Sequence, residues 1–216
     1  MKIHSLFTSI NGEVCSPHQG SLTTFIRTFG CNCRCSYCDS KFSYTGTPIK
    51  MRVRDIVKEV KKTSCKNVTI TGGEPLLQKG IVNLIRDLQI EGFNISVETN
   101  GSIFIPTAYK TSWVADYKLP SSGCESQMNL NNYINLNYGD FIKFVVSDRT
   151  DFDRALEVLL DIQRICRGNM KFAFSPAFGK HKNSPETLAQ WMIENPMLQS
   201  IGAIYNLQIH KILKVK

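Results

Sequence analysis

Hydrophobic positions along the chain follow two periods, which change from segment to segment. Short runs rich in β-branched and aromatic residues predict strands, whereas apolar residues spaced i, i+3, i+4 and i+7 predict helices with one buried face. Strands are predicted over residues 22–29, 68–71, 94–98, 113–116, 141–146, 171–174 and 203–209. Helices are predicted over 52–62, from 81 to just before Gly92, over 151–164 and over 185–194. The polar segment 121–137 predicts a long loop.

The alternation of strands and helices predicts the fold class. Repeated β-α units favour a largely parallel sheet covered by helices. If such a sheet curls, it forms a complete or partial α/β barrel, in which ligands bind at the carboxyl ends of the strands. The candidate chemistry of this chain falls mostly at those ends.

Length and composition predict one domain over residues 1–216. With 42% hydrophobic residues among 216, the chain can build a substantial core, which excludes wholesale disorder. No apolar run exceeds three residues, so no membrane span is expected. The first residues lack the apolar segment of a secretory signal, and a cytoplasmic location is expected. The formal net charge of +8 suits an anionic partner without selecting one.

Four of the eight cysteines lie between residues 31 and 38. The spacing Cys31-x3-Cys35-x2-Cys38 places three thiolates on one tight loop, and Cys33 falls outside it. Three thiolates can hold three irons of a 4Fe–4S cube and leave the fourth open to a ligand. Zinc is the alternative, but it prefers four ligands, often in two pairs, and the remaining cysteines are solitary. The spacing therefore favours iron–sulfur over zinc.

The cysteine spacing resembles the signature of radical S-adenosylmethionine (SAM) enzymes, with Tyr37 at their usual aromatic position before the third cysteine. The segment Thr71-Gly72-Gly73-Glu74-Pro75 resembles the GGEP motif of the same superfamily, where backbone groups meet the methionine moiety. Glycine permits such a close backbone approach. The resemblance implies an incomplete TIM-like α/β barrel, a 4Fe–4S cluster and SAM, which is cleaved reductively to a radical that abstracts hydrogen from substrate.

Further segments resemble the 7-carboxy-7-deazaguanine synthase family over nearly the whole chain. They read Ser-Ile-Asn-Gly-Glu at 9–13, Phe-Ile-Arg-Thr-Phe-Gly-Cys at 25–31, Cys-Asp-Ser at 38–40, Val-Glu-Thr-Asn-Gly at 97–101, Asp-Tyr-Lys-Leu-Pro at 116–120 and Leu-Gln-Ile-His-Lys at 207–211. The resemblance implies ring contraction of 6-carboxy-5,6,7,8-tetrahydropterin to 7-carboxy-7-deazaguanine with loss of ammonia, on the path to queuosine and other 7-deazapurines. It also implies Mg²⁺ and regeneration of SAM after each turnover.

The resemblance assigns roles to residues of this chain. Cluster ligands are Cys31, Cys35 and Cys38. SAM contacts are Tyr37, Asp39, Gly73, Glu74, Asp116, Tyr117, Lys118, Ser175, Pro176, Ala177 and Phe178. Substrate contacts are Asn11, Gly12, Glu13, Arg27, Thr71, His210 and Lys216. Arg27 suits the substrate carboxylate because a guanidinium binds a carboxylate through two parallel bonds, and Glu13 would read the donor edge of the pterin. Ser40 replaces the threonine that binds magnesium in the family, and its hydroxyl is a hard oxygen ligand.

Three departures from the family pattern bear on these assignments. Asn11 replaces the usual glutamine and Val14 the usual glycine in the substrate loop, while Asp116-Tyr117-Lys118 differs from the Ser-Pro-Lys form of part of the family. Taken singly, many of these side chains have ordinary explanations, such as a solvated carboxylate at Glu13 or a basic tail at Lys211. Their order and spacing together carry the assignment.

Expected partners follow from the chemistry and the charge. The cluster needs an electron, and an acidic donor such as flavodoxin or ferredoxin would be attracted by Arg34 and Lys41 beside the cysteines. A small pterin substrate and a homodimer are expected, with no membrane and no direct nucleic-acid partner. Two alternatives stay open: a radical SAM activating enzyme for a glycyl-radical protein, and a zinc-binding nucleic-acid module, although no basic-aromatic RNA motif appears.

Overall fold

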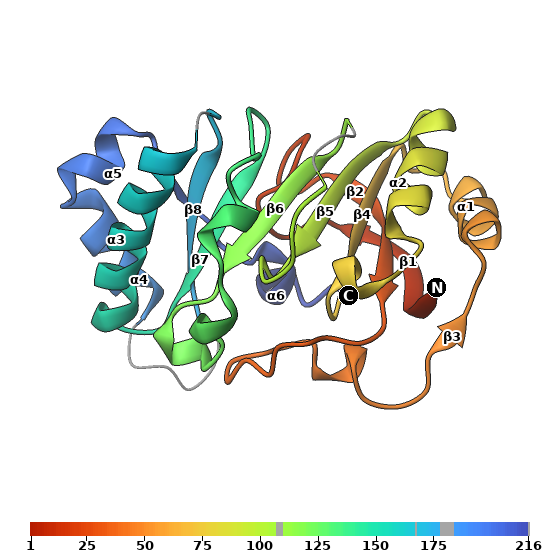
Figure 1. Ribbon diagram of the computed structural model, residues 1–216, viewed down its shortest axis with the longest axis horizontal. Coiled ribbons are helices and arrows are strands. Elements are labelled where there is room, and N and C mark those ends of the chain that lie inside the picture. Colours follow the sequence, from red (N-terminus) through yellow and green to blue (C-terminus); the bar gives the residue numbers. More distant parts are fainter. Residues whose placement is uncertain (107–109, 167, 178–183, 216) are drawn as a thin grey trace.

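The computed structural model describes residues 1–106, 110–166, 168–177 and 184–215 (Figure 1). Within them, one nine-stranded sheet has the order β3-β1-β2-β4-β5-β6-β7-β8-β9. The strands are β1 Lys2–Ile10, β2 Leu22–Thr28, β3 Ile49–Lys50, β4 Asn67–Gly72, β5 Asn94–Thr99, β6 Ser112–Tyr117, β7 Phe141–Val146, β8 Lys171–Pro176 and β9 Ile204–Tyr205. Strands β2 and β4 to β9 pair in parallel, and β1 pairs antiparallel with β2 and β3.

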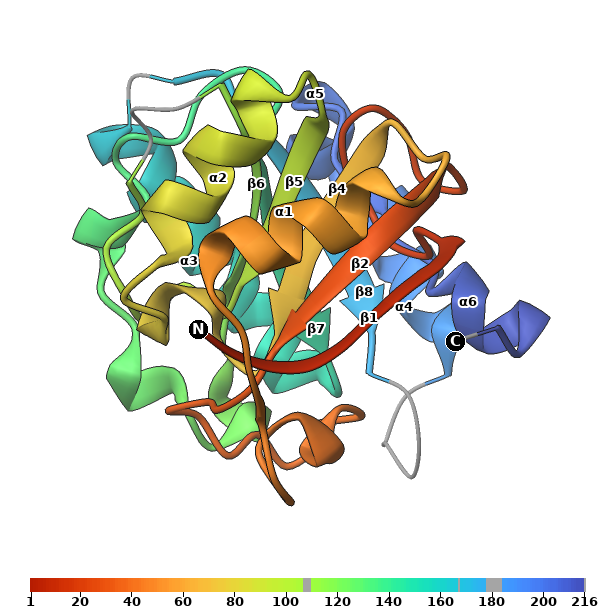
Figure 2. The ribbon, with the colours of Figure 1, turned by 90° about the vertical axis from the view of Figure 1, so that its right-hand side faces the viewer.

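Six α-helices occur in the described residues, and they pack mainly on the outer side of the curved sheet (Figure 1). They are α1 Val53–Lys61, α2 Ile81–Ile90, α3 Arg149–Ile165, α4 Pro185–Ile193, α5 Pro196–Ser200 and α6 Ile209–Leu213. Figure 2 shows α1 and α2 on one side of the strands and α6 on the other. The sheet curls without closing, which confirms the expected partial α/β barrel.

The helix periodicity places the main core as predicted. Ile81, Leu84, Ile85 and Leu88 of α2 are all buried in the layer between the sheet and the helices. The left-handed conformation of Gly92, with φ of 79°, follows directly after that helix. Ser184 caps α4 by accepting a hydrogen bond from the backbone N–H of Thr187, as the Ser-Pro pair predicts.

The secondary structure differs from the sequence prediction at three places. The strand predicted over 203–209 ends at Tyr205, and α6 begins at Ile209. The predicted loop 121–137 contains two complete 3-10 turns and the end of a third. Strand β1 was not predicted because its side chains are mostly half-buried, so it lacks a clear apolar alternation. None of the helices in the described residues has the length and apolar character needed to cross a membrane.

The inner face of the barrel has an apolar layer below a charged one. Val14, from the segment between β1 and β2, packs inside the barrel against Val114, Phe141 and Ala173. One alternation further along the strands, Asp116 and Lys143 also face inward. The Val14 backbone N–H donates to Asn206 Oδ1 at 2.9 Å. The β1–β2 segment therefore contacts the chain just after β9. It fills the barrel interior below the layer of Asp116 and Lys143.

Candidate active site

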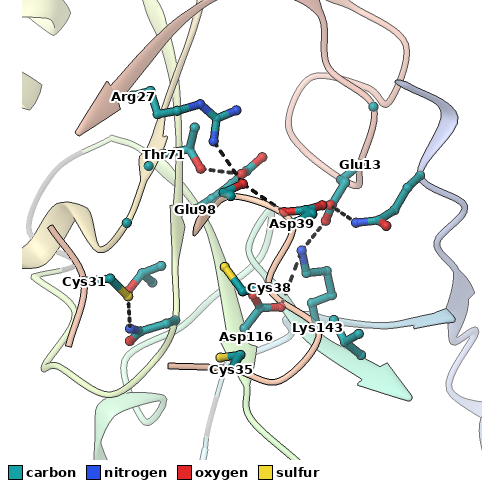
Figure 3. Close-up of a pocket in the computed structure, with 18 of the residues that line it drawn as sticks. Glu13, Arg27, Cys31, Cys35, Cys38, Asp39, Thr71, Glu98, Asp116 and Lys143 are labelled. Carbon is teal, nitrogen blue, oxygen red and sulfur yellow. Dashed lines mark hydrogen bonds and ion pairs between the residues drawn. The ribbon is translucent and has the colours of Figure 1, made fainter. Parts of the chain in front are cut away.

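One pocket opens at the carboxyl ends of the inner strands, beneath the segment that follows β2 (Figure 3). Fifteen of the residues assigned from the sequence line it. They are Asn11, Gly12, Glu13, Arg27, Cys31, Cys35, Tyr37, Cys38, Asp39, Ser40, Thr71, Gly73, Asp116, Lys118 and His210. The three cysteines thus share a cavity with the proposed substrate contacts, although they come from segments far apart in sequence.

Five assigned residues lie elsewhere in the described chain. Glu74, Tyr117, Ser175, Pro176 and Ala177 are buried but do not line the pocket. Tyr117 lies between two inward-facing residues of the same segment, so its ring faces the helix layer and packs near Tyr133. Ser175 faces inward but donates its hydroxyl to the Asn206 carbonyl at 2.9 Å. Phe178 and Lys216 fall outside the described residues.

The cysteine loop is held by its own backbone and by Arg34. The Arg34 guanidinium donates to the carbonyls of Cys31 and Cys33 at 2.8 and 2.7 Å and lies over the Tyr44 ring at 4.3 Å. The Cys38 backbone N–H donates to the Cys35 carbonyl at 3.2 Å. The sequence predicts that Arg34 attracts an acidic electron donor, but in the structure its guanidinium binds within the loop.

The thiols of this loop suit an iron–sulfur cluster. Hydrogen bonding by the Cys33 thiol, which outweighs burial, lowers the pKa of Cys31 and of Cys35 to about 6, while burial raises the pKa of Cys38. Thiolates are the form that binds iron. Among the described residues, no three Cys, His, Asp or Glu side chains converge on a single metal ion. A cube binds each thiolate to a different iron, and three cysteines of one loop that line the same pocket suit it.

Two further sulfur atoms lie beside the three ligands. Cys33 is only 2% exposed, and its sulfur accepts a hydrogen bond from Asn100 Nδ2 at 3.3 Å. Cys124 is equally buried, with its sulfur 3.8 Å from that of Cys35. Cys124 lies in a segment predicted to be a loop, and no sequence pattern indicates that it lies next to the cluster loop.

The Gly-Gly turn after β4 packs directly on the cysteine loop. A Cβ atom on Gly73 would lie 2.0 Å from the Gly30 carbonyl oxygen and 3.0 Å from Cys31 Cβ, so a side chain there would push the loop away. Glu74 next to it is fully buried and turned away from the pocket. Its carboxylate accepts from Leu76 N, Thr99 Oγ1 and Asn100 N at 2.9, 2.8 and 2.7 Å. Glu74 therefore ties the turn to the end of β5.

Arg27 and Thr71 reach the pocket from neighbouring strands. The Arg27 guanidinium lies 5.8 Å from the centre of the Phe7 ring and 5.4 Å from that of Phe42, so aromatic faces hold a cation inside the barrel. Thr71 donates its hydroxyl to Glu98 at 2.7 Å. Burial, reinforced by the Glu13 carboxylate, raises the pKa of Glu98. The pocket thus holds a fixed cation and a carboxyl group that retains its proton more readily than usual.

The carboxyl-terminal helix α6 closes one side of the pocket. Lys211 Nζ lies 2.7 Å from Asp39 Oδ2, and Ser40 donates to Asp39 Oδ1 at 2.8 Å. Burial opposes ionisation of Asp39, but Lys211 outweighs it, so the pKa of Asp39 is lowered. His210 packs against Gly12, where a Cβ would lie 2.1 Å from the ring Nδ1, and burial lowers its pKa. Lys211 is therefore a member of the pocket and not of a solvated tail.

Four charged side chains of alternating sign line the pocket, and Figure 3 labels three of them, Glu13, Lys143 and Asp116. Lys143 Nζ pairs with Glu13 and lies 3.4 Å from Asp116 Oδ1, and Lys118 Nζ lies 2.8 Å from Asp116 Oδ2. Asp116 Oδ1 is buried and accepts no hydrogen bond from the described residues, so its contact with Lys143 is a longer ion pair. The sequence reasoning missed Lys143. Its signal was a lysine inside an otherwise apolar strand, as for Arg27.

Comparison with known proteins identifies similar chains. Residues 25–111 match the Radical SAM superfamily. The chain is 39% identical to a 7-carboxy-7-deazaguanine synthase of Clostridium acetobutylicum, over 98% of this chain and 95% of that protein. It is 33% identical to a protein of the same name from Thermoplasma acidophilum, over 99% of this chain and 97% of the relative.

Solved structures share the fold. The crystal structure of QueE from Escherichia coli superposes with a TM-score of 0.76 at 21% identity, covering 96% of this chain and 93% of that one. Streptococcus suis SuiB bound to S-adenosylmethionine gives a TM-score of 0.61 at 12% identity, over 82% of this chain and 48% of SuiB. The likeness to SuiB shows the barrel alone, whereas the full-length relatives share sequence as well.

Proposed function

The chain belongs to the 7-carboxy-7-deazaguanine synthase family of radical SAM enzymes, and we propose that the pocket described above carries out that family's reaction. The reaction contracts the ring of 6-carboxy-5,6,7,8-tetrahydropterin to give 7-carboxy-7-deazaguanine and ammonia. The full-length similarity to these synthases carries this conclusion. It also favours a synthase over the activating enzyme and the zinc-binding module considered from the sequence.

The cysteine loop would hold the redox cofactor. Cys31, Cys35 and Cys38 line the pocket, and the glycine at 73 lets the Gly-Gly turn lie against their loop. When bound, the 4Fe–4S cluster and SAM supply an electron and a carbon radical that removes hydrogen from the substrate. Asp116 would contact SAM on this side through Oδ1, which accepts no hydrogen bond among the described residues, while Lys118 holds its other oxygen.

The opposite wall would hold the pterin. Arg27 offers its planar guanidinium to the substrate carboxylate, and its aromatic neighbours restrict the side chain. Glu13 offers carboxylate oxygen to the N–H groups of the pterin, and Thr71 and His210 line the same pocket. Such fixed contacts orient the substrate for hydrogen removal, and correct orientation contributes strongly to rate.

A magnesium ion would bind between this wall and the cysteine loop. Ser40 lines the pocket 3.5 Å from the Arg27 guanidinium, where the substrate carboxylate is proposed to lie. Its hydroxyl donates to Asp39, and its oxygen keeps lone pairs that could bind the ion. Mg²⁺ favours hard oxygens and retains several waters, which a site of one hydroxyl and substrate oxygens satisfies.

An acidic electron donor would dock beside the cysteine loop. Lys41 is exposed just after the loop and, unlike Arg34, forms no ion pair or side-chain hydrogen bond among the described residues. A homodimer and a cytoplasmic location stay predictions from the sequence.

The proposed activity is tested with protein purified and reconstituted without oxygen. We expect iron and sulfide in a 4:4 ratio per chain, as a single cube requires. With SAM, a reductant and 6-carboxy-5,6,7,8-tetrahydropterin, 7-carboxy-7-deazaguanine and ammonia should appear in equal amounts. Stoichiometric zinc without iron, or reductive cleavage of SAM without pterin conversion, would contradict the proposal.

A further inference from the structure

A buried lysine, Lys143, contacts both a proposed substrate residue, Glu13, and a proposed SAM residue, Asp116. Lys143 extends inward from β7, and its side chain is 7% exposed. Its ammonium pairs with Glu13 of the β1–β2 segment and with Asp116, its register neighbour on β6. Figure 3 shows Lys143 directed between these two carboxylates. The proposed pterin contact and the proposed SAM contact therefore share one cation.

Stability alone does not account for these charges. Removing an ion pair from water costs free energy that its attraction often fails to recover, and apolar residues of similar volume usually serve as well. The layer directly below consists of Val14, Val114, Phe141 and Ala173, so an apolar side chain at position 143 would extend an existing core. The lysine instead supplies an ammonium group that holds the carboxylates around it in place.

The groups that face Lys143 hold it charged. Burial opposes its ionisation, but the carboxylates of Asp116, Glu13 and Glu98 outweigh burial and raise its pKa. The second oxygen of Glu13 accepts a hydrogen bond from Gln208 Nε2 at 2.5 Å. Both oxygens of Glu13 thus face donors of the protein, and a carboxylate in this arrangement can only accept hydrogen bonds.

We propose that Lys143 is a specificity-determining residue that holds the Glu13 carboxylate in place as a hydrogen-bond acceptor, so that the pocket selects a heterocycle presenting N–H donors and rejects one presenting a carbonyl at the same edge. The inference rests on the proposed function, because it assigns Glu13 to the donor edge of the pterin. A carbonyl placed against Glu13 would meet a second acceptor and leave both groups without a donor. Discrimination built on hydrogen bonding of this kind can reach several orders of magnitude.

The test compares two stable ligands that differ at one group. Anaerobic, cluster-reconstituted, SAM-loaded protein is titrated with 6-carboxypterin and with 6-carboxylumazine, in which oxygen replaces the 2-amino group. The readout is the ratio of the two dissociation constants and does not depend on turnover. The wild-type protein should prefer the pterin by about a hundredfold or more.

Variants at both ends of the pair make the test specific. In Lys143→Met the Glu13 carboxylate loses the ammonium that holds one of its oxygens, so it can turn away from the pterin edge and the preference should fall about tenfold or more. Lys143→Arg should keep the preference within about threefold, because the charge remains. Glu13→Gln should lower the preference as Lys143→Met does, and the double variant should lower it no further, since both act through one contact.

Controls separate this effect from a loss of structure. Lys61→Met removes a surface ion pair with Glu91 on the outer helices and should leave the ratio unchanged. Far-UV circular dichroism and cluster absorbance report folding, and the double variant carries no unpaired charge from this pair. An unchanged ratio in a folded Lys143→Met, or a lost preference in Lys143→Arg, would overturn the inference. If wild-type protein failed to convert the tetrahydropterin, the proposed function would fail instead.

Discussion

The buried carboxylate of Glu74 accepts a hydrogen bond from the backbone N–H of Asn100 at 2.7 Å. This contact joins the turn after β4 to the end of β5, so the two strand ends that flank the cysteine loop move as one. A residue assigned from its motif to cofactor binding thus lies behind the pocket wall. It would influence SAM through the backbone that it holds.

Glu74 predicts a pH dependence of stability. Burial, which exceeds the effect of the hydrogen bonds from Asn100, Leu76 and Thr99, raises its pKa from 4.5 to about 7. The folded protein therefore binds this proton more tightly than the unfolded chain does. The stability contributed by this group is complete below pH 4.5 and is lost as pH rises through about 7.

The variant Glu74→Gln isolates that contribution. Its amide does not titrate, and its NH₂ group faces a backbone donor, so we expect a loss of about 1–3 kcal/mol at pH 5.5. The difference from wild type in the free energy of unfolding should shrink between pH 5.5 and pH 8. Chemical denaturation at several pH values measures it, and a constant difference would contradict the assigned pKa.

The cysteine loop predicts which thiols hold the cluster. Alanine at Cys31, Cys35 or Cys38 should reduce bound iron to a small fraction of the wild-type value, because a cube held by two thiolates is exposed and labile. Cys33→Ala and Cys124→Ala are matched controls, being buried thiols beside the same loop, and should retain iron. Iron and sulfide analysis after anaerobic reconstitution compares the cluster content of the five variants with that of the wild-type protein. Loss of iron in Cys33→Ala with retention in Cys31→Ala would mean a different ligand register.

The close approach of Gly73 to the cysteine loop predicts a steric effect. In Gly73→Ala the added methyl would lie 2.0 Å from the Gly30 carbonyl oxygen, so the loop must shift. We expect SAM affinity to fall at least about tenfold, since small misplacements of a site have large effects. Gly92→Ala is the control, because nothing lies within 4 Å of its added methyl and only backbone strain results. Equilibrium dialysis with labelled SAM measures both; equal affinities would argue against this contact.

Ser40 predicts the magnesium response. Ser40→Ala removes the protein hydroxyl beside Asp39 and should abolish most of the acceleration by Mg²⁺, while SAM still binds. Ser40→Thr keeps the hydroxyl and should keep the response. Turnover is measured across a magnesium titration in all three proteins. A wild-type response in Ser40→Ala would remove this residue from the metal site.

The exposed Lys41 leads us to expect that the electron donor docks beside the cysteine loop. Lys41→Glu should slow turnover driven by flavodoxin about threefold or more at low salt, with a smaller effect at high salt, because screening weakens steering between exposed charges. Turnover with a small chemical reductant should stay near the wild-type rate. Lys58→Glu, on the outer helix α1, makes the same charge change away from the loop. Equal losses in both Lys variants would indicate a general charge effect without a docking site.

The sequence alone determined the features that depend on residues close together in the chain. Helix α2 and strand β7 follow from periodicity alone, because burial of one face fixes the spacing of apolar residues. The cysteine loop and the Gly-Gly turn were identifiable because their chemistry depends on short spacings within one segment. Arg27 carried a weaker signal of the same kind, a charge inside an apolar strand.

Tertiary structure decided what depends on partners distant in sequence. Lys143 acquires its role only when β7 lies beside β6 and the β1–β2 segment enters the barrel, which brings Glu13 from 130 residues away. Glu74 and Tyr117 lie next to pocket residues in sequence, yet the pleat and the turn direct them elsewhere. The pairing of Lys211 with Asp39 likewise requires α6 to lie against the cysteine loop. Sequence order specifies which groups are present, and the curvature of the sheet determines which of them meet.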